Sequence, residues 1–317
     1  MTRRARGLLV QAALAAALLL GLGYLAWNTA QNLEARKIAS GFAYLWREAG
    51  FEIGETGFFS YNAADSYLRA LAIGLANTLR VAALGVMLAT VLGTLLGLAR
   101  MAPNLLLSKL AGAYVEAVRN VPLLVQLFFW YVLISENLPA PAAALNPLPG
   151  VFLSNRGIFF PLPGDPPVLA GFNFSGGGAL SPEFAALLAG LVTYTAAFIA
   201  EIVRAGVLSV PRGQVEAARS LGLGRGDTLR RVVLPQALRL IVPPLTSQYL
   251  NLTKNSSLAV AIGYPDLVSI ANTTMNQTGQ AIEGVAVIMA TFLTISLSIS
   301  AFMGWYNRRV ALRGLAR

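Results

Sequence analysis

The sequence has no cysteine and no histidine, and it has few charged residues for a chain of 317 residues. It therefore offers no disulfide, no thiolate or imidazole metal ligand, and no histidine for acid–base or Ser-His-Asp catalysis. Charged residues make up 12% of the chain, about half of the roughly 25% that is typical of soluble globular proteins. Clustered carboxylates are also lacking, so an integral-membrane enzyme is the weakest function class.

Long apolar runs dominate what the sequence does contain. Hydrophobic residues make up 56% of the chain, its mean hydropathy is +0.62, and its formal net charge is +10. This hydrophobicity argues against a disordered chain. A basic charge can indicate nucleic acid, but basic residues beside apolar runs indicate a membrane first.

Six segments are apolar and long enough to cross a bilayer as helices, which takes about 20 residues. They are residues 8–27, 71–98, 117–138, 184–208, 236–262 and 285–306, the fifth of which is strongly interrupted. The sequence thus predicts an all-α integral membrane protein with about six transmembrane helices. The first span is either a signal peptide, because arginines precede it, or a retained anchor. Its full bilayer width and its end at Tyr24 and Trp27 favour the anchor.

Basic residues are distributed unequally over the loops between these spans. If the N-terminus is cytoplasmic, the cytoplasmic segments hold 16 of the 24 basic residues and the outer segments hold 5. This asymmetry fits the positive-inside rule, and six spans place both arginine-rich ends on the same side. We therefore expect cytoplasmic N- and C-termini, with the net charge acting chiefly as an orientation signal.

The chain divides into residues 1–69, an anchor helix with an extracytoplasmic segment, residues 70–307, the membrane core, and residues 308–317, a basic cytoplasmic tail. Within the first part, residues 31–49 suit a surface helix. Within the core, residues 139–182 are rich in proline and glycine and predict an irregular extracytoplasmic loop. Both outer segments are either loops that pack on the outer face or docking surfaces for an external partner.

The most informative segment is the predicted cytoplasmic loop of residues 209–235. It continues the fourth span as GVLSVPRGQVEAARSLGLGRGDTLRRVVLP, which is residues 206–235. Pro211 suits the first turn of a helix, residues 214–221 are good helix formers, and Gly222 with Gly224 can end that helix.

A second short helix is predicted from Asp227, a suitable N-cap, to Pro235. In the first helix, Glu216 and Arg219 stand three residues apart and can pair with each other or across an interface. The loop is therefore either a solvated amphipathic loop or a pair of short helices that lies in a groove of a partner.

Residues 216–235 match the EAA loop of ABC importer permeases, EAA-x3-G-x9-I-x-L-P. The matching residues are Glu216, Ala217, Ala218, Gly222, Leu234 and Pro235, and the one departure is Val232 in place of isoleucine. Three further stretches resemble segments of polar amino acid permeases: YVEAVRNVPLLVQLFFWY (114–131), TAAFIAEIVRAG (195–206) and LTKNSSLAVAIGYPDL (252–267). The resemblance covers about residues 70–307, and the long outer loops and extra N-terminal span are similar to the general L-amino acid branch.

The resemblance implies a permease of the type I ABC importer fold in a bacterial inner membrane, moving L-amino acids inward. It also implies that the loop is a coupling helix docked on an ATPase, through Glu216, Ala217, Ala218, Arg219, Ser220, Leu221 and Gly222. The implied partners are two ATPase subunits, a second homologous permease and a periplasmic amino acid-binding protein. The chain itself has no G-x-x-x-x-G-K-[ST] motif, so ATP and Mg²⁺ are expected on the partner and no cofactor on this chain.

Polar residues concentrate in the fifth span, where Pro243 and Pro244 are expected to interrupt the helix. Polar groups inside a membrane usually face an interior path or a partner, and discontinuous helices often hold substrate in transporters. Lys254 is suited to attract the carboxylate of an amino acid, and amides and hydroxyls can bind either charged group. The candidate pathway residues are Gln126, Gln248, Asn251, Lys254, Asn255 and Ser256; alternatively, they satisfy one another across helices.

Two i, i+3 pairs of opposite charge, Glu201–Arg204 and Glu116–Arg119, are expected to be local ion pairs. The alternative function is a self-contained secondary amino acid transporter. Six spans are few for such a protein, no inverted repeat is evident, and the EAA loop would lack a purpose. Co-purification with an ATPase separates the two functions from each other.

Overall fold

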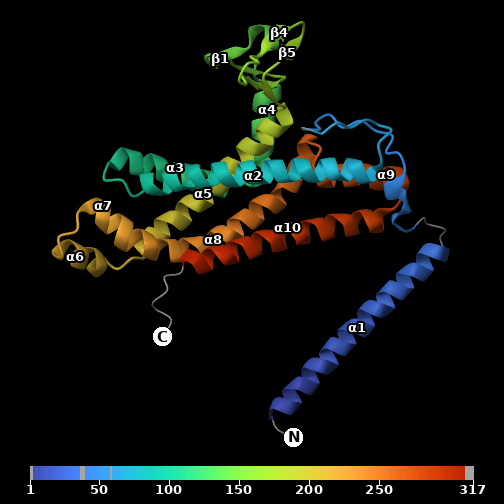
Figure 1. The fold of residues 1–317 in the computed structure, drawn as a ribbon, viewed down its shortest axis with the longest axis horizontal. Coiled ribbons are helices and arrows are strands. Elements are labelled where there is room, and N and C mark those ends of the chain that lie inside the picture. Colours follow the sequence, from blue (N-terminus) through green and yellow to red (C-terminus); the bar gives the residue numbers. More distant parts are fainter. Residues whose placement is uncertain (1–2, 36–39, 58, 311–317) are drawn as a thin grey trace.

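The structure is a computed structural model, which describes residues 3–35, 40–57 and 59–310. It is mainly helical (Figure 1). The helical elements are α1 (Arg3–Ala35), η1 (Phe42–Trp46), α2 (Tyr67–Ala99), α3 (Leu105–Asn120), α4 (Leu123–Ser135), η2 (Pro141–Ala143), α5 (Pro182–Leu208), α6 (Arg212–Ser220), α7 (Arg225–Thr228), η3 (Leu229–Val233), α8 (Leu234–Asn255), η4 (Ser256–Ile262), α9 (Leu267–Thr278) and α10 (Ala281–Val310). Most of the predicted tail, residues 311–317, lies outside the described residues.

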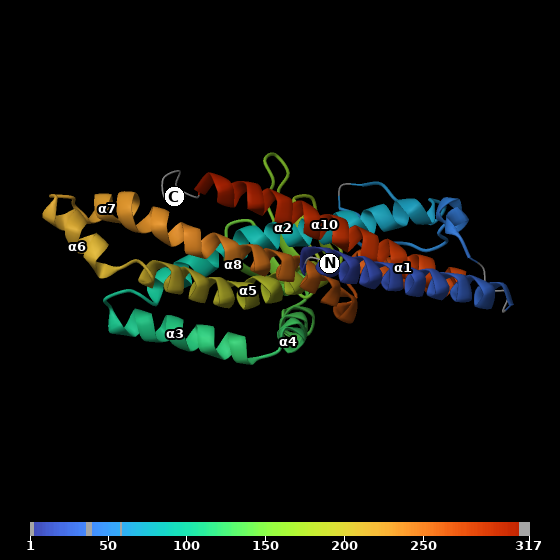
Figure 2. The ribbon, with the colours of Figure 1, turned by 90° about the horizontal axis from the view of Figure 1, so that it is seen from below.

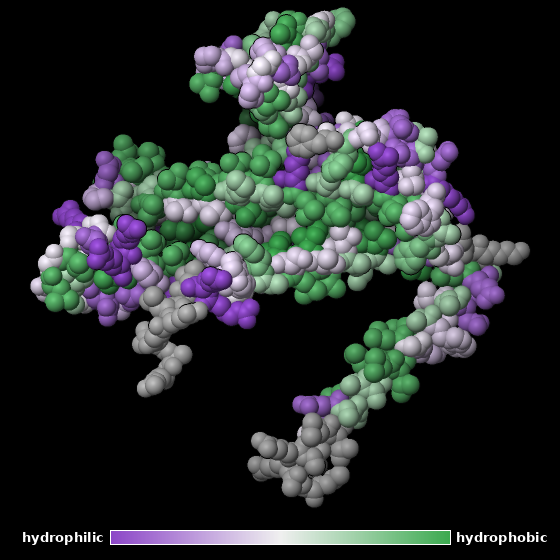
Figure 3. Space-filling model, in the orientation of Figure 1, coloured by the Kyte–Doolittle hydropathy of each residue, from purple (hydrophilic) through white to green (hydrophobic). Residues whose placement is uncertain are grey.

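Four helices in the described part of the chain are long and apolar enough to cross a membrane. They are α2, α5, the Val10–Ala35 part of α1 and the Ala281–Arg309 part of α10. The bent pair α3–α4 makes a fifth if it counts as one span. Hydrophobic side chains cover these helices, while hydrophilic ones gather at the α6–α7 end and near residues 40–66 (Figure 3). The predicted all-α membrane fold is confirmed, although α8, the predicted fifth span, does not reach this apolar threshold.

Helices α2 and α5 form the tightest interface of the bundle, and α8 packs on both of them (Figures 1 and 2). Gly93 and Gly97 make this contact possible. A Cβ atom on Gly93 would lie 2.6 Å from Cβ of Ile199, and one on Gly97 would lie 2.7 Å from the carbonyl oxygen of Ala200. The GxxxG spacing therefore brings two backbones close together, as such spacings do in membranes.

The third predicted span is wrong as a single helix. The chain bends by 105° between α3 and α4. Val121, the residue at the bend, has an extended backbone (φ −100°, ψ 129°) and precedes Pro122. Proline disfavours the helical conformation in the residue before it, and this explains why the helix stops at Asn120 and restarts at Leu123.

The predicted interruption of the fifth span at Pro243 and Pro244 is also wrong. Helix α8 runs through both prolines, whose rings are exposed, and ends at Asn255. The helix changes character later, at the 3-10 helix η4, which stops at Gly263 with a φ of 78°. Glycine adopts this left-handed conformation without strain.

The predicted irregular loop at residues 139–182 is instead partly a β structure. Strands β1 (Leu145–Leu148), β2 (Val151–Ser154), β3 (Gly157–Phe160) and β6 (Gly178–Leu180) form one antiparallel sheet, while β4 (Val168–Ala170) and β5 (Asn173–Ser175) form another. Phe174 stacks on Phe152 at 4.6 Å and lies 4.9 Å from Phe159, so a small aromatic core joins the sheets. Local apolar pairing outweighs the proline and glycine content here.

The first outer segment packs on the bundle rather than forming a surface helix over residues 31–49. Helix α1 continues to Ala35, residues 36–39 lie outside the described residues, and only the short helix η1 follows. Tyr44 is buried with Tyr67 of α2 and Leu267 of α9. This segment therefore fixes the outer ends of α2 and α9 to each other.

Candidate functional site

The EAA residues lie on α6, at the end of the molecule farthest from α9 (Figures 1 and 2). Helix α6 ends in a Schellman motif, in which the Gly222 amide donates to the carbonyl of Arg219 (2.9 Å) and the Leu223 amide to that of Ala218 (3.1 Å). Gly222 has a φ of 80° and open space where a Cβ would stand. The left-handed backbone conformation at this position therefore favours glycine, whereas crowding by a neighbouring residue of this chain does not.

Six of the seven predicted coupling residues are exposed, namely Glu216, Ala217, Arg219, Ser220, Leu221 and Gly222. Ala218 is the exception: it is buried where α6 packs against the following helical segment. Leu221 is 84% exposed, although it is a large apolar residue. Helix α6 is thus packed against its own chain through Ala218, while its exposed polar and apolar side chains are not covered by other residues of the described chain.

The predicted pair between Glu216 and Arg219 does not occur among the ion pairs of the described residues. The loop is held together elsewhere, by Arg231 and Asp227 at 3.0 Å. Asp227 is not the N-cap as predicted, because α7 begins one turn earlier with Gly224 as its cap. Its carboxylate instead lies in the first turn of α7, where its negative charge is attracted to the positive end of the helix dipole.

The predicted end of the second helix at Pro235 is wrong. The chain remains helical from Arg225 into α8, through the π-helical segment η3 that precedes Pro235. Proline is tolerated in the first turn of a helix, where its missing N–H is not needed. Helices α7, η3 and α8 therefore form one continuous rod from the loop into the bundle, with α6 lying against it.

Next to this loop, Glu201 joins α5 to the end of α2. Its carboxylate accepts hydrogen bonds from both Arg204 and Arg100, and Nε of Arg204 lies 3.2 Å from Oε2 of Glu201. The predicted Glu201–Arg204 pair is confirmed, whereas Arg100 is 101 positions away and no local spacing could reveal it. The predicted Glu116–Arg119 pair is wrong, because Arg119 lies over the ring of Phe198 at 5.1 Å.

Four predicted pathway residues lie on or near one face of α8, close to its end. Gln248, Asn251 and Asn255 follow the i, i+3, i+7 spacing of a helix face, and Lys254 lies beside them. Asn251 and Lys254 are exposed, Gln248 and Asn255 are half-buried, and none of the four side chains has a hydrogen bond within the described part of the chain. This face therefore offers free donors and acceptors.

The other two predicted pathway residues have partners inside the chain. Ser256 is buried and donates to the carbonyl of Thr253 at 2.8 Å. Gln126 donates to the carbonyls of Val118 (2.8 Å) and Val121 (3.0 Å). Gln126 thus satisfies the carbonyl groups that the bend between α3 and α4 leaves without helical partners.

A polar junction at the opposite end of the bundle is not evident from the sequence. Glu55, from the first outer segment, binds Arg80 of α2 (2.6 Å) and accepts a hydrogen bond from Ser181 at the start of α5 (2.6 Å). Arg80 also lies 4.3 Å from the ring of Phe184. The partners of Arg80 come from segments that are distant in sequence.

Asp266 caps α9 at this same end, and its Oδ1 accepts from the amide of Ser269 at 2.8 Å. The side chain is fully buried, and its Oδ2 has no hydrogen-bond partner among the described residues. Burial raises the pKa of Asp266 from its ordinary value of 3.8 to about 7. Within the described residues, no group of three or more acidic side chains could hold a metal ion.

Comparison with known proteins gives consistent results. Residues 85–312 match the family described as binding-protein-dependent transport system inner membrane component. The chain is 46% identical to the putative amino-acid ABC transporter permease protein YhdX of Escherichia coli, with 92% of this chain and 90% of that protein aligned. It is 40% identical to the general L-amino acid transport system permease protein AapQ of Rhizobium johnstonii, over 92% and 89% of the two chains.

Solved structures share the fold. A chain from an amino acid ABC transporter crystallised with histidines matches with a TM-score of 0.56 and 28% identity, covering 77% of this chain and 95% of that one. A chain from the inward-facing MetNI methionine ABC transporter matches with a TM-score of 0.53 over 77% and 98% of the two chains. At 19% identity, this second likeness concerns the fold alone.

Proposed function

The chain belongs to the family of binding-protein-dependent transport system inner membrane components, and on that premise we propose that it moves L-amino acids into the cell as the permease subunit of an ATP-driven importer. The names of its relatives support this cargo. They are permeases for general L-amino acids in one case and for glutamate and aspartate in another. The individual amino acids that this chain carries are left open within that class.

The observation that carries the proposal is the uncovered surface of α6. A nine-residue helix whose EAA residues are mostly exposed is too small to gain much stability by itself. Its open face, with Glu216 and Leu221, suits a groove on an ATPase subunit. The continuous rod from α7 to α8 would carry a movement of that subunit into the bundle, where Glu201 ties α5 to α2.

We propose the face of α8 with Gln248, Asn251, Lys254 and Asn255 as part of the amino acid pathway. An amino acid carries one carboxylate and one ammonium group. Lys254 can donate to the carboxylate. The side-chain amides can donate to the carboxylate or accept from the ammonium group. The absence of partners within the described chain supports this role, because an exposed polar group inside a membrane is otherwise costly.

The transporter as a whole would need further subunits. We propose two ATPase subunits, a second homologous permease and an external binding protein, in a bacterial inner membrane with both termini of this chain in the cytoplasm. ATP and Mg²⁺ would bind the ATPase subunits, since this chain has no phosphate-binding loop. ATP binding would close the ATPase pair, α6 would transmit this closure, and the membrane helices would alternate between outward and inward openings.

Co-purification tests the docking role of α6. The chain is expressed with an amino acid ABC transporter ATPase from the same organism, and the ATPase retained on the tagged permease is measured for wild type and Glu216→Arg. We expect a stable complex for wild type and a clear loss for the variant, with unchanged membrane insertion. Equal retention in both would contradict the docking role, and no retention in either would contradict the importer assignment.

A further inference from the structure

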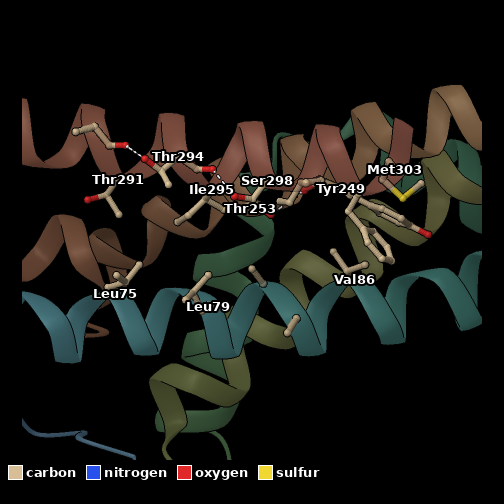
Figure 4. A pocket seen from close by; sticks show the side chains of 15 residues that line it. Leu75, Leu79, Val86, Tyr249, Thr253, Thr291, Thr294, Ile295, Ser298 and Met303 are labelled. Atoms are coloured by element: carbon tan, nitrogen blue, oxygen red, sulfur yellow. Dashed lines mark hydrogen bonds between the residues drawn. The ribbon is translucent and has the colours of Figure 1, made fainter. Parts of the chain in front are cut away.

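A groove of about 900 Å³ runs between α2 and α10 and is floored by α8 (Figure 4). Leu79 and Val86 line it from α2, and Ile295 and Met303 line it from α10. Helix α10 packs against α8 and α9, so its side toward α2 remains open. A groove of this size on a membrane helix bundle must be filled, either by lipid or by protein.

The chemistry of the groove suits an apolar occupant. The hydroxyls of Thr253, Thr294 and Ser298 each donate to the carbonyl four residues earlier in their own helices, at 2.7 to 2.8 Å. Tyr249 shares a hydrogen bond with Thr90 at 2.9 Å. None of the six predicted pathway residues lines the groove. It is therefore separate from the polar face of α8.

Helix α1 is an apolar helix with an uncovered surface. None of the apolar window of Val10–Ala35 is buried, and its large side chains are mostly exposed, with Tyr24 at 60% and Trp27 at 62%. A helix that is apolar all round normally lies in a core or in a membrane. In Figure 1, α1 points away from α10, yet both helices are long and apolar enough to cross the same bilayer. Helices that cross a bilayer lie within tens of degrees of its normal, so α1 and α10 are expected to run roughly alongside each other in the membrane.

A tether holds the outer end of α1 next to α10 of the same chain. The Gly41 amide donates to Oε1 of Glu283 (2.6 Å), and Nε2 of Gln280 donates to the Gly41 carbonyl (3.0 Å). Six Cα–Cα steps separate Gly41 from Ala35, so the end of α1 lies within about 20 Å of the start of α10. Such a short connection gives α1 a high effective concentration at α10.

We infer that α1 docks antiparallel to α10 of its own chain and fills the groove between α10 and α2. With the outer ends of the two helices level, Gly21 lies at the depth of Ile295, because both helices rise by about 1.5 Å per residue. Ala13, Ala17 and Gly21 then present a small-residue stripe at the depth of the groove.

The surface of α10 complements that stripe. Ile295, Ile299 and Met303 form a ridge at four-residue spacing that lines the groove. Small residues on one helix let a ridge of large residues on the other approach closely, which is the usual basis of helix association in membranes. The anchor thereby becomes a packed part of the permease, and its small residues face α10.

Disulfide formation tests this arrangement directly, because the chain has no native cysteine. Cysteine is introduced at Leu18, Leu19 or Leu20, three consecutive positions that together sample every face of α1. Each is combined with Ser298→Cys, which lines the groove at the depth of Leu18, and the full complex is oxidised in native membranes. A protease site inserted at Phe172, a residue that is 93% exposed between β4 and β5, later separates α1 from α10.

We expect at least one pair to keep the cleaved chain together at single-chain mass on a non-reducing gel. The matched control is the same α1 cysteine with Leu110→Cys, a residue that is 61% exposed on α3; it should give at least about tenfold less product, since effective concentration decides the yield. Products heavier than one chain would place α1 on another subunit and overturn the inference. Absence of a disulfide in all three pairs of an active transporter would leave the groove to lipid, which also overturns it.

Discussion

The α2–α5 interface and the α6 loop both use small residues, but for opposite purposes. Gly93 and Gly97 are covered by the backbone of α5, so close that a single methyl group would collide. Ala217 and Gly222 on the loop are exposed, with open space around Gly222. Small residues that the chain covers itself maintain its own packing, whereas uncovered ones leave room for another molecule.

The largest effect is expected at the covered site. Gly93→Leu should abolish the folded permease, because overpacking against Ile199 and the backbone of Ala196 costs about 3 kcal/mol or more. The measurement is the amount of monodisperse protein extracted from membranes. Gly112→Leu serves as the control, since no atom of a neighbouring residue lies within 4 Å of the place on α3 where its Cβ would stand. Similar yields for both variants would mean that the close packing of Gly93 against α5 does not maintain the fold.

At the uncovered site, the fold should survive while the function fails. Glu216→Arg should lower ATP-driven transport by at least about 30-fold, because reversing a charge at an interface typically costs about 2 kcal/mol or more. Expression and thermal stability should equal those of wild type. The double variant Glu216→Arg/Arg219→Glu sharpens the test: rescue would mean a local pair after all, contrary to the structure.

The polar face of α8 should respond more moderately. Lys254→Ala should raise the KM for amino acid uptake by about tenfold, in line with the loss of one charged hydrogen bond. Asn251→Ala should act in the same direction. Ser257→Ala is the neighbouring control, because its hydroxyl already donates to the carbonyl of Lys254 at 2.8 Å. Unchanged uptake in both test variants would remove this face from the pathway.

Substitutions at Gly222 distinguish an effect on the backbone conformation of the loop from an effect on direct contact with the ATPase. Gly222→Ala should reduce coupling by about fivefold, because a left-handed backbone costs an L-residue roughly 1 kcal/mol. Gly222→Asn should be milder, since asparagine accepts this conformation more readily. Coupling is measured as amino acid molecules transported per ATP hydrolysed. An asparagine variant worse than the alanine variant would mean that the ATPase contacts this position directly.

The smallest effect concerns Asp266, whose pKa is about 7 in the folded chain and 3.8 ordinarily. A folded-state pKa above the ordinary value means that stability falls as the pH rises from about 4 to about 7. The Tm of the purified complex should therefore be a few degrees lower at pH 8 than at pH 5. Asp266→Asn keeps an acceptor for the Ser269 amide and should reduce this difference. An unaltered difference would assign it to another group.

The sequence was sufficient where structure depends on neighbours along the chain. Apolar runs predicted α1, α2, α5 and α10, and the helix formers at residues 214–221 located α6 within two residues of its observed start. The helix stop at Gly222 followed from glycine alone. These features depend on local periodicity and capping, which one sequence displays in full.

Features that depend on distant contacts could not be predicted in this way. The partners of Glu55 lie 25 and 126 positions away, and Arg100 reaches Glu201 across 101 positions. The β strands of residues 139–182 form because Phe174 meets Phe152 and Phe159, which proline and glycine content conceals. Proline alone also did not show where a helix is interrupted. Pro122 lies at the bend between α3 and α4, whereas α8 continues through Pro243 and Pro244.

This permease is expected to work only with a separate ATPase. The most direct test is amino acid uptake into proteoliposomes that contain the permease with or without the ATPase and the binding protein. We predict that uptake requires all components, with Mg²⁺-ATP on the side of the membrane where the ATPase is bound. The permease alone should give no uptake under a proton or sodium gradient. Gradient-driven uptake by this chain alone would show that it transports without an ATPase and would contradict the importer function.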